Sequence, residues 1–97
     1  MYRIVYTKQA AKDIENLKTV GLSEKAKNLI EVVRENPFQN PPPYEKLVGN
    51  LSGYFSRRIN LQHRLVYQVY SEAVKVDSIL YEGTVKIIRM WTHYDGV

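Results

Sequence analysis

Two neighbouring residues near the end of the chain, His93 and Tyr94, are of types that can transfer protons or contact a nucleobase. They lie in the sequence MWTHYDGV (residues 90–97), and because chain ends are commonly disordered, a frayed terminus is the alternative interpretation. The chain has no cysteine and only two histidines, which excludes disulfides and cysteine zinc sites and argues against a dedicated metal site. We therefore expect no metal and no cofactor, and any chemistry must come from carboxylates, histidine, tyrosine, lysine and arginine.

Composition and charge limit the classes of function. A chain of 97 residues with 44% hydrophobic and 25% charged residues predicts one globular domain over residues 1–97. The excess of 14 Lys and Arg over 10 Asp and Glu gives a net charge of +4, which is compatible with a polyanionic partner but common in proteins that bind none. Eight tyrosines add groups that could stack on bases or pack a sheet. No run is long and apolar enough for a membrane span, and the first residues are too polar for a secretory signal, so a cytoplasmic location without membrane contact is expected.

The first third of the chain predicts one strand and two helices. Residues 2–7 (YRIVYT) alternate and are rich in strand-forming residues, and Thr7 can cap a following helix that stops at Gly21. The apolar residues of this helix recur at helical spacing: Ala10, Ile14, Leu17 and Val20. Ser23 is a candidate cap for a second helix, which ends at Asn36-Pro37 and has its own apolar face: Ala26, Leu29, Ile30 and Val33. The two helices should form an antiparallel hairpin that lies on an apolar surface.

The remainder of the chain predicts a loop followed by strands. The proline-rich stretch NPFQNPPPYEKLVGN (36–50) forbids a regular helix or a central strand, so an extended loop is expected there. Strands follow at YFSRRIN (54–60), RLVYQVY (64–70) and TVKIIRMW (84–91), while AVKVDSILY (73–81) is either a further strand or an elongated hairpin arm. The element order is thus βααββββ or βααβββ. It predicts an α+β fold with both helices on one face of the sheet and the other face open.

The alternation of side chains in the strands selects candidates for the open face. Phe55 and Ile59 are large and apolar and should face the helices with Arg57, so the neighbouring Arg58 should face outward. On the next strand Leu65 and Tyr67 should pack inward, which also directs Arg64 to the open face. Of the adjacent pair, one arginine is expected to be a surface charge and the other a snorkelling side chain. His63, in the turn between these strands, is expected to be structural or solvent-exposed, and Trp91 to pack the last strand.

The segment EKLVGNLSGYFSRRINLQHRLVYQV (45–69), together with WTHY (91–94), resembles the Txe/YoeB family of bacterial toxins within the RelE superfamily. The resemblance extends over nearly the whole chain, and the composite LSGYFSRRI followed by HRLVY is more specific than a short motif. It implies a RelE-like, microbial-RNase-like βααβββ(β) fold with an antiparallel-rich sheet. It also implies a toxin of a type II toxin-antitoxin system that cleaves mRNA in the ribosomal A site by attack of a 2′-hydroxyl on phosphate, without metal.

The resemblance also implies roles for individual residues. Glu45 corresponds to the general base, Arg58 and Arg64 to the phosphate-binding arginines, His93 to the general acid and Tyr94 to its adjoining tyrosine. A base for the 2′-hydroxyl, an acid for the leaving 5′-oxygen and cations for the charged phosphorane form a sufficient set for this reaction. The implied partners are an antitoxin of the YefM/Axe type, the 70S ribosome with its mRNA, and a second copy of the chain in the toxin-antitoxin complex.

The chain departs from the family pattern at three places. Some relatives carry a basic residue where this chain has Val48, and we expect Lys46 to take over its contact with RNA phosphate. Some relatives end at the histidine-tyrosine pair, whereas this chain continues with residues 95–97, so Asp95 either replaces a terminal carboxylate or belongs to a tail. The segment of residues 71–83 is longer than the corresponding segment in the shorter members of the family.

Two other functions stay open at the level of the sequence. A ParE-like toxin would keep the fold but bind DNA gyrase without RNA chemistry, and a basic RNA-binding or regulatory domain would lack catalysis. The presence of Glu45, Arg64 and His93 together argues against the ParE-like toxin, because a protein that only binds has no need of an acid, a base and a phosphate-binding group.

Overall fold

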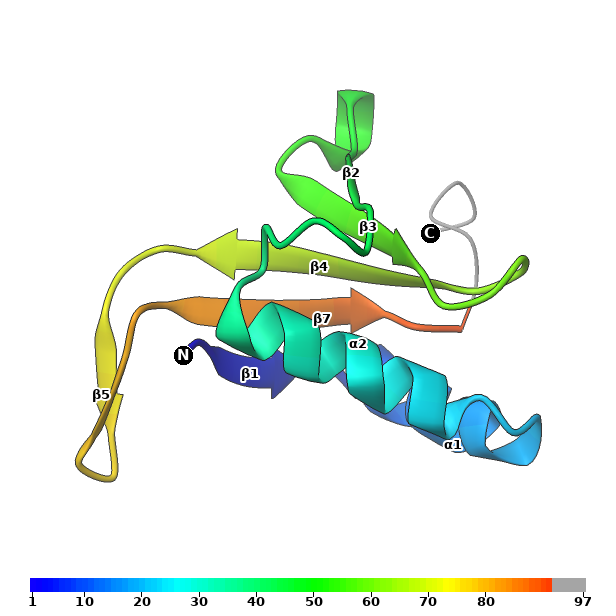
Figure 1. Cartoon of the computed structure of the whole chain (residues 1–97), viewed down its shortest axis with the longest axis horizontal. Helices are drawn as coiled ribbons and strands as arrows, with labels where there is room; N and C mark the ends of the chain where they lie inside the picture. Colours follow the sequence, from blue (N-terminus) through cyan, green and yellow to red (C-terminus); the bar gives the residue numbers. More distant parts are fainter. Residues whose placement is uncertain (92–97) are drawn as a thin grey trace.

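The computed structural model describes residues 1–91, which form a five-stranded mixed sheet, two α-helices and a separate two-stranded hairpin (Figure 1). The elements in chain order are β1 (Arg3–Tyr6), α1 (Lys8–Thr19), α2 (Ser23–Glu35), β2 (Glu45–Lys46), the 3-10 turn η1 (Gly49–Leu51), β3 (Tyr54–Arg58), β4 (Arg64–Tyr70), β5 (Val74–Val76), β6 (Ile79–Tyr81) and β7 (Thr84–Arg89). Neither helix in this part of the chain has the length and apolar run needed to cross a membrane.

The ends of α1 follow from local hydrogen bonds. Thr7 Oγ1 accepts the Ala10 N–H at 3.0 Å, which confirms the expected N-cap. At the other end Gly21 adopts φ +75°, and two backbone bonds close a Schellman motif, from Leu22 N to Leu17 O and from Gly21 N to Lys18 O. This left-handed conformation suits glycine, so the predicted stop is also confirmed.

The start of α2 differs from the prediction. Ser23 is the first helical residue and Leu22 holds the capping position, with no side-chain hydrogen bond to the helix N-terminus. The Schellman closure of α1 already places Leu22 beside the next helix, so the turn leaves no separate capping residue. The end of α2 is as expected, because Asn36 terminates it immediately before Pro37.

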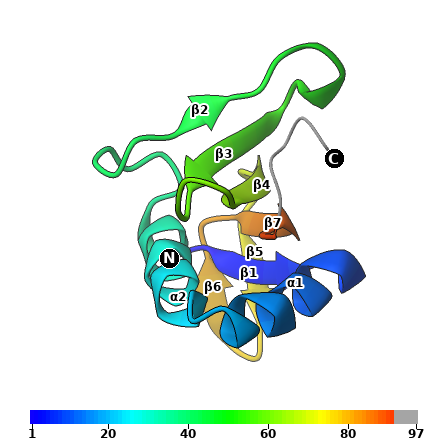
Figure 2. The same ribbon diagram turned by 90° about the vertical axis from the view of Figure 1, so that its right-hand side faces the viewer.

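The main sheet has the strand order β1-β7-β4-β3-β2. Strand β1 pairs in parallel with β7, whereas β7 with β4, β4 with β3, and β3 with β2 are antiparallel. The sheet is therefore rich in antiparallel pairs, and the first and last long strands lie side by side. Figure 2 shows the sheet extending away from the helices, from β1 through β7 and β4 to β3 and β2.

The proline-rich segment contains one element that the sequence did not predict. Residues Glu45 and Lys46 form the short strand β2, which pairs with β3 at the edge of the sheet. The expectation of an extended loop without a central strand holds around it, because an edge strand needs hydrogen bonds on one side only. The pairing gives Glu45 a defined place opposite Ser56.

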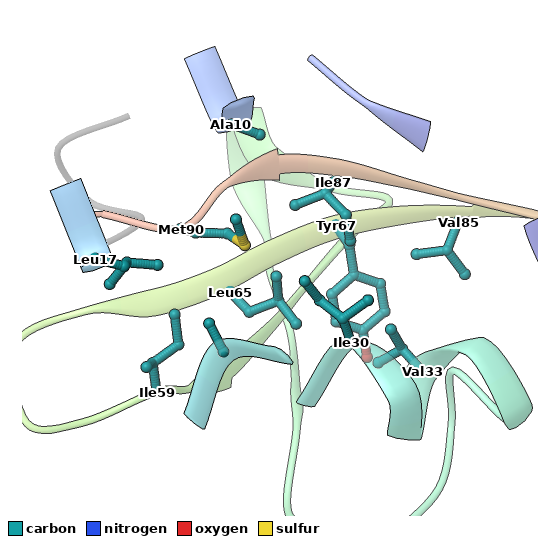
Figure 3. Close-up of a cluster of buried hydrophobic side chains, with 11 residues drawn as sticks. Ala10, Leu17, Ile30, Val33, Ile59, Leu65, Tyr67, Val85, Ile87 and Met90 are labelled. Atoms are coloured by element: carbon teal, nitrogen blue, oxygen red, sulfur yellow. The ribbon is translucent and has the colours of Figure 1, made fainter. Parts of the chain in front are cut away.

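The core lies between the two helices and one face of the sheet (Figure 3). Alternate residues of β4 and β7 supply the sheet side, and each helix supplies its apolar stripe. The fully or nearly fully buried apolar residues are Ala10, Leu17, Ala26, Ile30, Val33, Ile59, Leu65, Tyr67, Val85, Ile87 and Met90. Because both helices and a single face of the sheet contribute to this cluster, the predicted α+β architecture with both helices on one face is confirmed. No helix in residues 1–91 covers the opposite face, although Ser56 and Val66 on it are buried.

Residues 71–83 form a hairpin arm rather than a further strand of the sheet. Strands β5 and β6 pair only with each other, around a two-residue turn in which Asp77 and Ser78 have φ 49° and 69°. Positive φ at both central residues matches the right-handed twist of the flanking strands, which explains a tight turn. Figure 1 shows the arm extending beyond the ends of β4 and β7.

Candidate active site

Glu45 and Arg64 meet on the open face of the sheet. An Nη2 N–H of Arg64 donates to Glu45 Oε1 at 2.9 Å, and the Arg64 Nε–H donates to Ser56 Oγ at 2.5 Å. The strand register explains the meeting, because Glu45 pairs with Ser56, which lies beside Arg64 on the same face of the sheet. The Arg64 side chain is only 10% exposed, whereas that of Glu45 is 55% exposed. The pair therefore combines a cation held rigidly in the sheet with a carboxylate that solvent and a substrate can reach.

Arg58 supplies a second cation to the same face. It lies directly opposite Arg64 in the β3–β4 ladder and its side chain is exposed. Within residues 1–91 no hydrogen bond or ion pair is found for its guanidinium. Like charges opposite each other on neighbouring strands repel, so an anion between them would be stabilising.

A cavity of about 250 Å³ marks the place where these groups converge. It is lined by Pro43, Tyr44, Glu45, Arg58 and Arg64. The exposed guanidinium of Arg58 can bind a pair of phosphate oxygens, Arg64 adds a second positive charge beside it, and the carboxylate can accept a proton. The cavity thus brings a carboxylate together with two cations of a kind that binds phosphate.

Arg57, the neighbour of Arg58, is fully buried and holds the proline-rich loop. Its guanidinium donates to the carbonyl oxygens of Pro42 at 2.6 Å and Pro37 at 3.0 Å, and to Tyr67 Oη at 3.0 Å. Its charge also lies 4.9 Å from the centre of the Tyr44 ring. The expectation that one arginine of the pair snorkels is therefore wrong, because Arg57 finds all its partners inside the protein.

Aromatic packing completes the support of this loop. Phe38 and Tyr44 both pack edge-on against Phe55 and are tilted against each other, and Phe55 stacks on Tyr67 at 5.7 Å. Tyr67 also donates its hydroxyl to Pro37 O at 2.7 Å. Burial raises the pKa of Tyr67 above its ordinary value, although the neighbouring Arg57 acts in the opposite direction. The tyrosine that holds the loop is thus kept in its neutral, donating form.

Two other predicted positions lie apart from this cluster. Lys46 pairs with Phe55 across the β2–β3 ladder, on the opposite side of β2 from Glu45. The structure therefore does not bring Lys46 to the Glu45–Arg64 pair. Val48, where some relatives carry a basic residue, is 83% exposed. The contact between Lys46 and RNA phosphate stays a prediction.

His63 and Trp91 connect the last described residue to the β3–β4 turn. Their rings stack at 4.2 Å with an angle of 18°, and His63 is only 4% exposed. The turn itself is closed by Asn60 Oδ1, which accepts the His63 N–H at 2.7 Å. His63 therefore has the structural place that was one of its two expected roles, and Trp91 packs the end of the last strand.

A buried ion pair anchors the end of β7 before Trp91. Asp13 of α1 is fully buried and its carboxylate accepts Arg89 Nε–H at 3.0 Å and Met90 N–H at 2.9 Å. No local pattern indicated this contact, because Asp13 lies among the buried apolar residues of α1. Three residues with predicted roles lie outside the described residues: His93 as the general acid, Tyr94 as its adjoining tyrosine, and Asp95 as a replacement for a terminal carboxylate or part of a tail.

The fold is shared by solved structures of bacterial toxins. The "YoeB/ParE toxin from Agrobacterium tumefaciens" superposes with a TM-score of 0.78 at 29% identity, covering 95% of this chain and 99% of that one. A YoeB dimer from Staphylococcus aureus superposes with a TM-score of 0.71 at 31% identity, covering 96% and 98%. YafQ from E. coli shares the fold, with a TM-score of 0.70 at 19% identity over 98% and 97% of the two chains.

Sequence comparison identifies the family. The model of the "YoeB-like toxin of bacterial type II toxin-antitoxin system" matches residues 6–94, so the chain belongs to this family. Toxin YoeB of Escherichia coli K12 is 40% identical over 58 residues, which are 60% of this chain and 69% of that protein. Toxin YoeB of Synechocystis is 51% identical over 41 residues, a match that spans 42% of this chain and 48% of that protein. The resemblance predicted from residues 45–69 is confirmed.

Proposed function

We propose that this toxin is an endonuclease that enters the A site of the 70S ribosome and cleaves mRNA without a metal ion. The observation that supports the proposal best is the hydrogen bond between the exposed Glu45 carboxylate and the rigid Arg64 guanidinium, with Arg58 on the adjoining position. This arrangement places a proton acceptor next to two phosphate-binding cations in one cavity. Attack of a 2′-hydroxyl on the adjacent phosphorus requires both a proton acceptor and cations that stabilise the phosphate.

In the proposed reaction Glu45 removes the proton of the ribose 2′-hydroxyl, and the 2′-oxygen attacks the adjacent phosphorus. Arg64 and Arg58 stabilise the negative charge of the phosphorane. The bond from phosphorus to the 5′-oxygen then breaks, and His93 protonates this leaving oxygen. The products are a 2′,3′-cyclic phosphate and a 5′-hydroxyl end, with Tyr94 and Lys46 as further RNA contacts.

Arg64 also orients the side chain of the proposed base, Glu45. Ser56 fixes the Nε of Arg64, which leaves Nη2 directed at Glu45. The hydrogen bond from Arg64 orients the Glu45 carboxylate at the cavity that both residues line. When phosphate enters the cavity, Arg64 can share its donors between the carboxylate and the substrate.

Cleavage in a translating extract tests the proposal. Purified toxin is added to an extract that translates a defined mRNA, and the new 5′-hydroxyl ends are mapped. We expect cuts within A-site codons, and intact mRNA would contradict the nuclease function. Loss of gyrase-dependent supercoiling would instead favour a ParE-like toxin, and stalled translation without cutting would favour a non-catalytic RNA-binding domain.

Two single substitutions test the assigned roles. Glu45→Gln and His93→Ala are each expected to reduce the cleavage rate by about 100- to 10,000-fold, the usual contribution of a general base or acid, while ribosome binding remains. Glu72→Gln is the matched control, because Glu72 is an exposed glutamate in the chain leading to the hairpin arm. Wild-type cleavage rates for Glu45→Gln or for His93→Ala would refute the corresponding assignment.

The proposed regulator is an acidic antitoxin of the YefM type that folds on the toxin as it binds. Support comes from the solved "YoeB-YefM complex from Staphylococcus aureus", which superposes with a TM-score of 0.69 at 30% identity over 97% of this chain and 99% of that one. The solved YoeB dimer supports pairing of two toxin copies. Co-expression with the neighbouring acidic reading frame, followed by measurement of the mass of the complex, tests both partners.

A further inference from the structure

A second cavity lies on the other side of the proline-rich loop from the candidate active site. Its volume is about 290 Å³, and α2 forms one wall through Lys25, Asn28 and Leu29. Pro42 and the end of β3, including Arg58, form the other wall. No role in the reaction proposed above uses this space.

Arg58 connects the second cavity to the active site. Arg58 is among the residues that line each cavity, while the consecutive prolines Pro42 and Pro43 line one cavity each. A phosphate bound by Arg58 would therefore have space for chemical groups on two sides. One side holds Glu45 and Arg64, and the other side is the second cavity.

The lining of the second cavity has the character of a nucleotide site. Its charged lining residues, Lys25 and Arg58, are both cationic, and no carboxylate lines it within residues 1–91. Leu29 and Val32, both half-buried, give it an apolar surface, on which the face of a base can pack. Asn28 adds an amide that can both donate to and accept from a base edge. A flat, partly apolar, anionic ligand fits this combination.

The walls of the cavity are held in place before any ligand binds. Arg57 donates to Pro42 O at 2.6 Å from a fully buried position, which ties the loop wall to the sheet. The helix wall is fixed by Ala26, Ile30 and Val33, which point into the core. A preformed cavity binds its ligand without the free-energy cost of ordering a loop.

From these observations we propose that the second cavity binds the mRNA nucleotide next to the cleaved bond. Lys25 and Arg58 contact its phosphate, Asn28 contacts its base edge, and Leu29 and Val32 pack against the base. The inference rests on the proposed nuclease function and adds a binding site for a neighbouring nucleotide to it. It predicts that the toxin senses the base beside the cut and not only the cleaved phosphate.

The test combines protein variants with mRNAs that lack one base. Programmed ribosomes carry an intact mRNA, or an mRNA with an abasic nucleotide on the 5′ or the 3′ side of the mapped cut, and kcat/KM is measured for each. Asn28→Ala and Lys25→Ala are expected to lower kcat/KM on intact mRNA about tenfold, as for loss of one hydrogen bond to a ligand. For Asn28→Ala this loss should disappear on one of the two abasic mRNAs, because the partner of the amide is then already gone.

Lys27→Ala is the matched control. Lys27 lies on the same helix with the same charge, but it lines the groove between α1 and α2 instead of the second cavity. Its kcat/KM is expected to equal that of the wild type. Circular dichroism and thermal unfolding of the three variants establish that each is folded, and substitution of exposed helix residues should preserve the fold.

The outcomes separate this proposal from the function on which it rests. No cleavage by the wild type would refute the nuclease function itself. Normal cleavage together with unchanged rates for Asn28→Ala and Lys25→Ala would overturn only the nucleotide site. An equal loss on intact and both abasic mRNAs, with weaker ribosome binding, would also overturn it, because the cavity would then hold a nucleotide of ribosomal RNA.

Discussion

Two consecutive arginines in β3 have opposite environments. Arg57 is fully buried, with three hydrogen bonds to the loop carbonyls and Tyr67, whereas Arg58 is exposed beside the candidate active site. The difference follows from the strand, because neighbouring side chains point to opposite faces of a sheet. One arginine therefore serves the structure and the other is available to a substrate.

Matched substitutions of this pair should separate stability from activity. Arg57→Met removes a buried cation and leaves carbonyl and hydroxyl groups without their donor, so we expect the free energy of unfolding to fall by about 3 kcal/mol. Arg58→Met should leave the free energy of unfolding nearly unchanged and lower the cleavage rate. Urea unfolding and cleavage assays of both variants measure the contrast. Equal stability of the two variants would contradict the clamp role of Arg57.

The buried Tyr67 predicts a loss of stability at alkaline pH. Burial raises its pKa in the folded state, so between the unfolded value of about 10 and the folded value the unfolded chain has released the proton that the folded protein keeps. Stability from this group is complete below pH 10 and decreases as the pH rises through that interval. In urea unfolding from pH 8 to 11.5, Tyr67→Phe should be less stable than the wild type at pH 8. Its free energy of unfolding should then fall less than that of the wild type as the pH rises. An identical pH slope in the two proteins would assign the effect to other groups.

At the scale of elements, the open face depends on a short strand and a clamped loop. Strand β2 has only two residues. Its register with β3, together with the hydrogen bond from Arg57 to Pro42 O, holds Glu45 within hydrogen-bond distance of Arg64. The β5–β6 arm makes no comparable contribution, since it pairs only with itself and extends away from the sheet. The two parts of the chain should therefore respond differently to shortening.

Replacement of residues 72–82 by an Asn-Gly turn tests the independence of the arm. Tyr70 and Thr84 are already register partners in the β4–β7 ladder, so a tight turn can join these strands. We expect a thermal unfolding midpoint within a few degrees of the wild type and unchanged mRNA cleavage. The deletion also removes Glu82, whose carboxylate pairs with the N-terminal ammonium of Met1, an exposed contact of small energy. Loss of cleavage by a folded deletion variant would show that the arm takes part in ribosome binding.

At the scale of the whole molecule, net charge predicts how the toxin approaches the ribosome. A charge of +4 and a basic open face favour association with RNA phosphates, and such binding weakens as salt rises because counterions are released. A plot of log affinity for the ribosome against log salt concentration should have a negative slope. Arg58→Met should reduce the magnitude of this slope by about one, while Lys27→Ala serves as the control. An affinity independent of salt would contradict a phosphate-binding face.

Much of the architecture could be predicted because it depends on local patterns. The helix stop at Gly21 and the apolar stripes of both helices follow from spacing and turn chemistry, and the structure confirms them. The outward place of Arg58 followed from the alternation of Phe55 and Ile59 in the same strand. The prediction of Ser23 as a cap was wrong, because the Schellman turn that ends α1 places Leu22 at the capping position of α2.

Other features depend on contacts between distant parts of the chain. The sequence by itself determined the residue types of the candidate site, the fold class and the family, because these are carried by periodicity and by one continuous motif. Only the tertiary structure decided that Glu45 reaches Arg64, that Arg57 clamps Pro42 and that Asp13 binds the end of β7. These pairs are 19, 15 and 76 residues apart. Partners at such separations meet through strand register and packing of the whole fold, which no local pattern specifies.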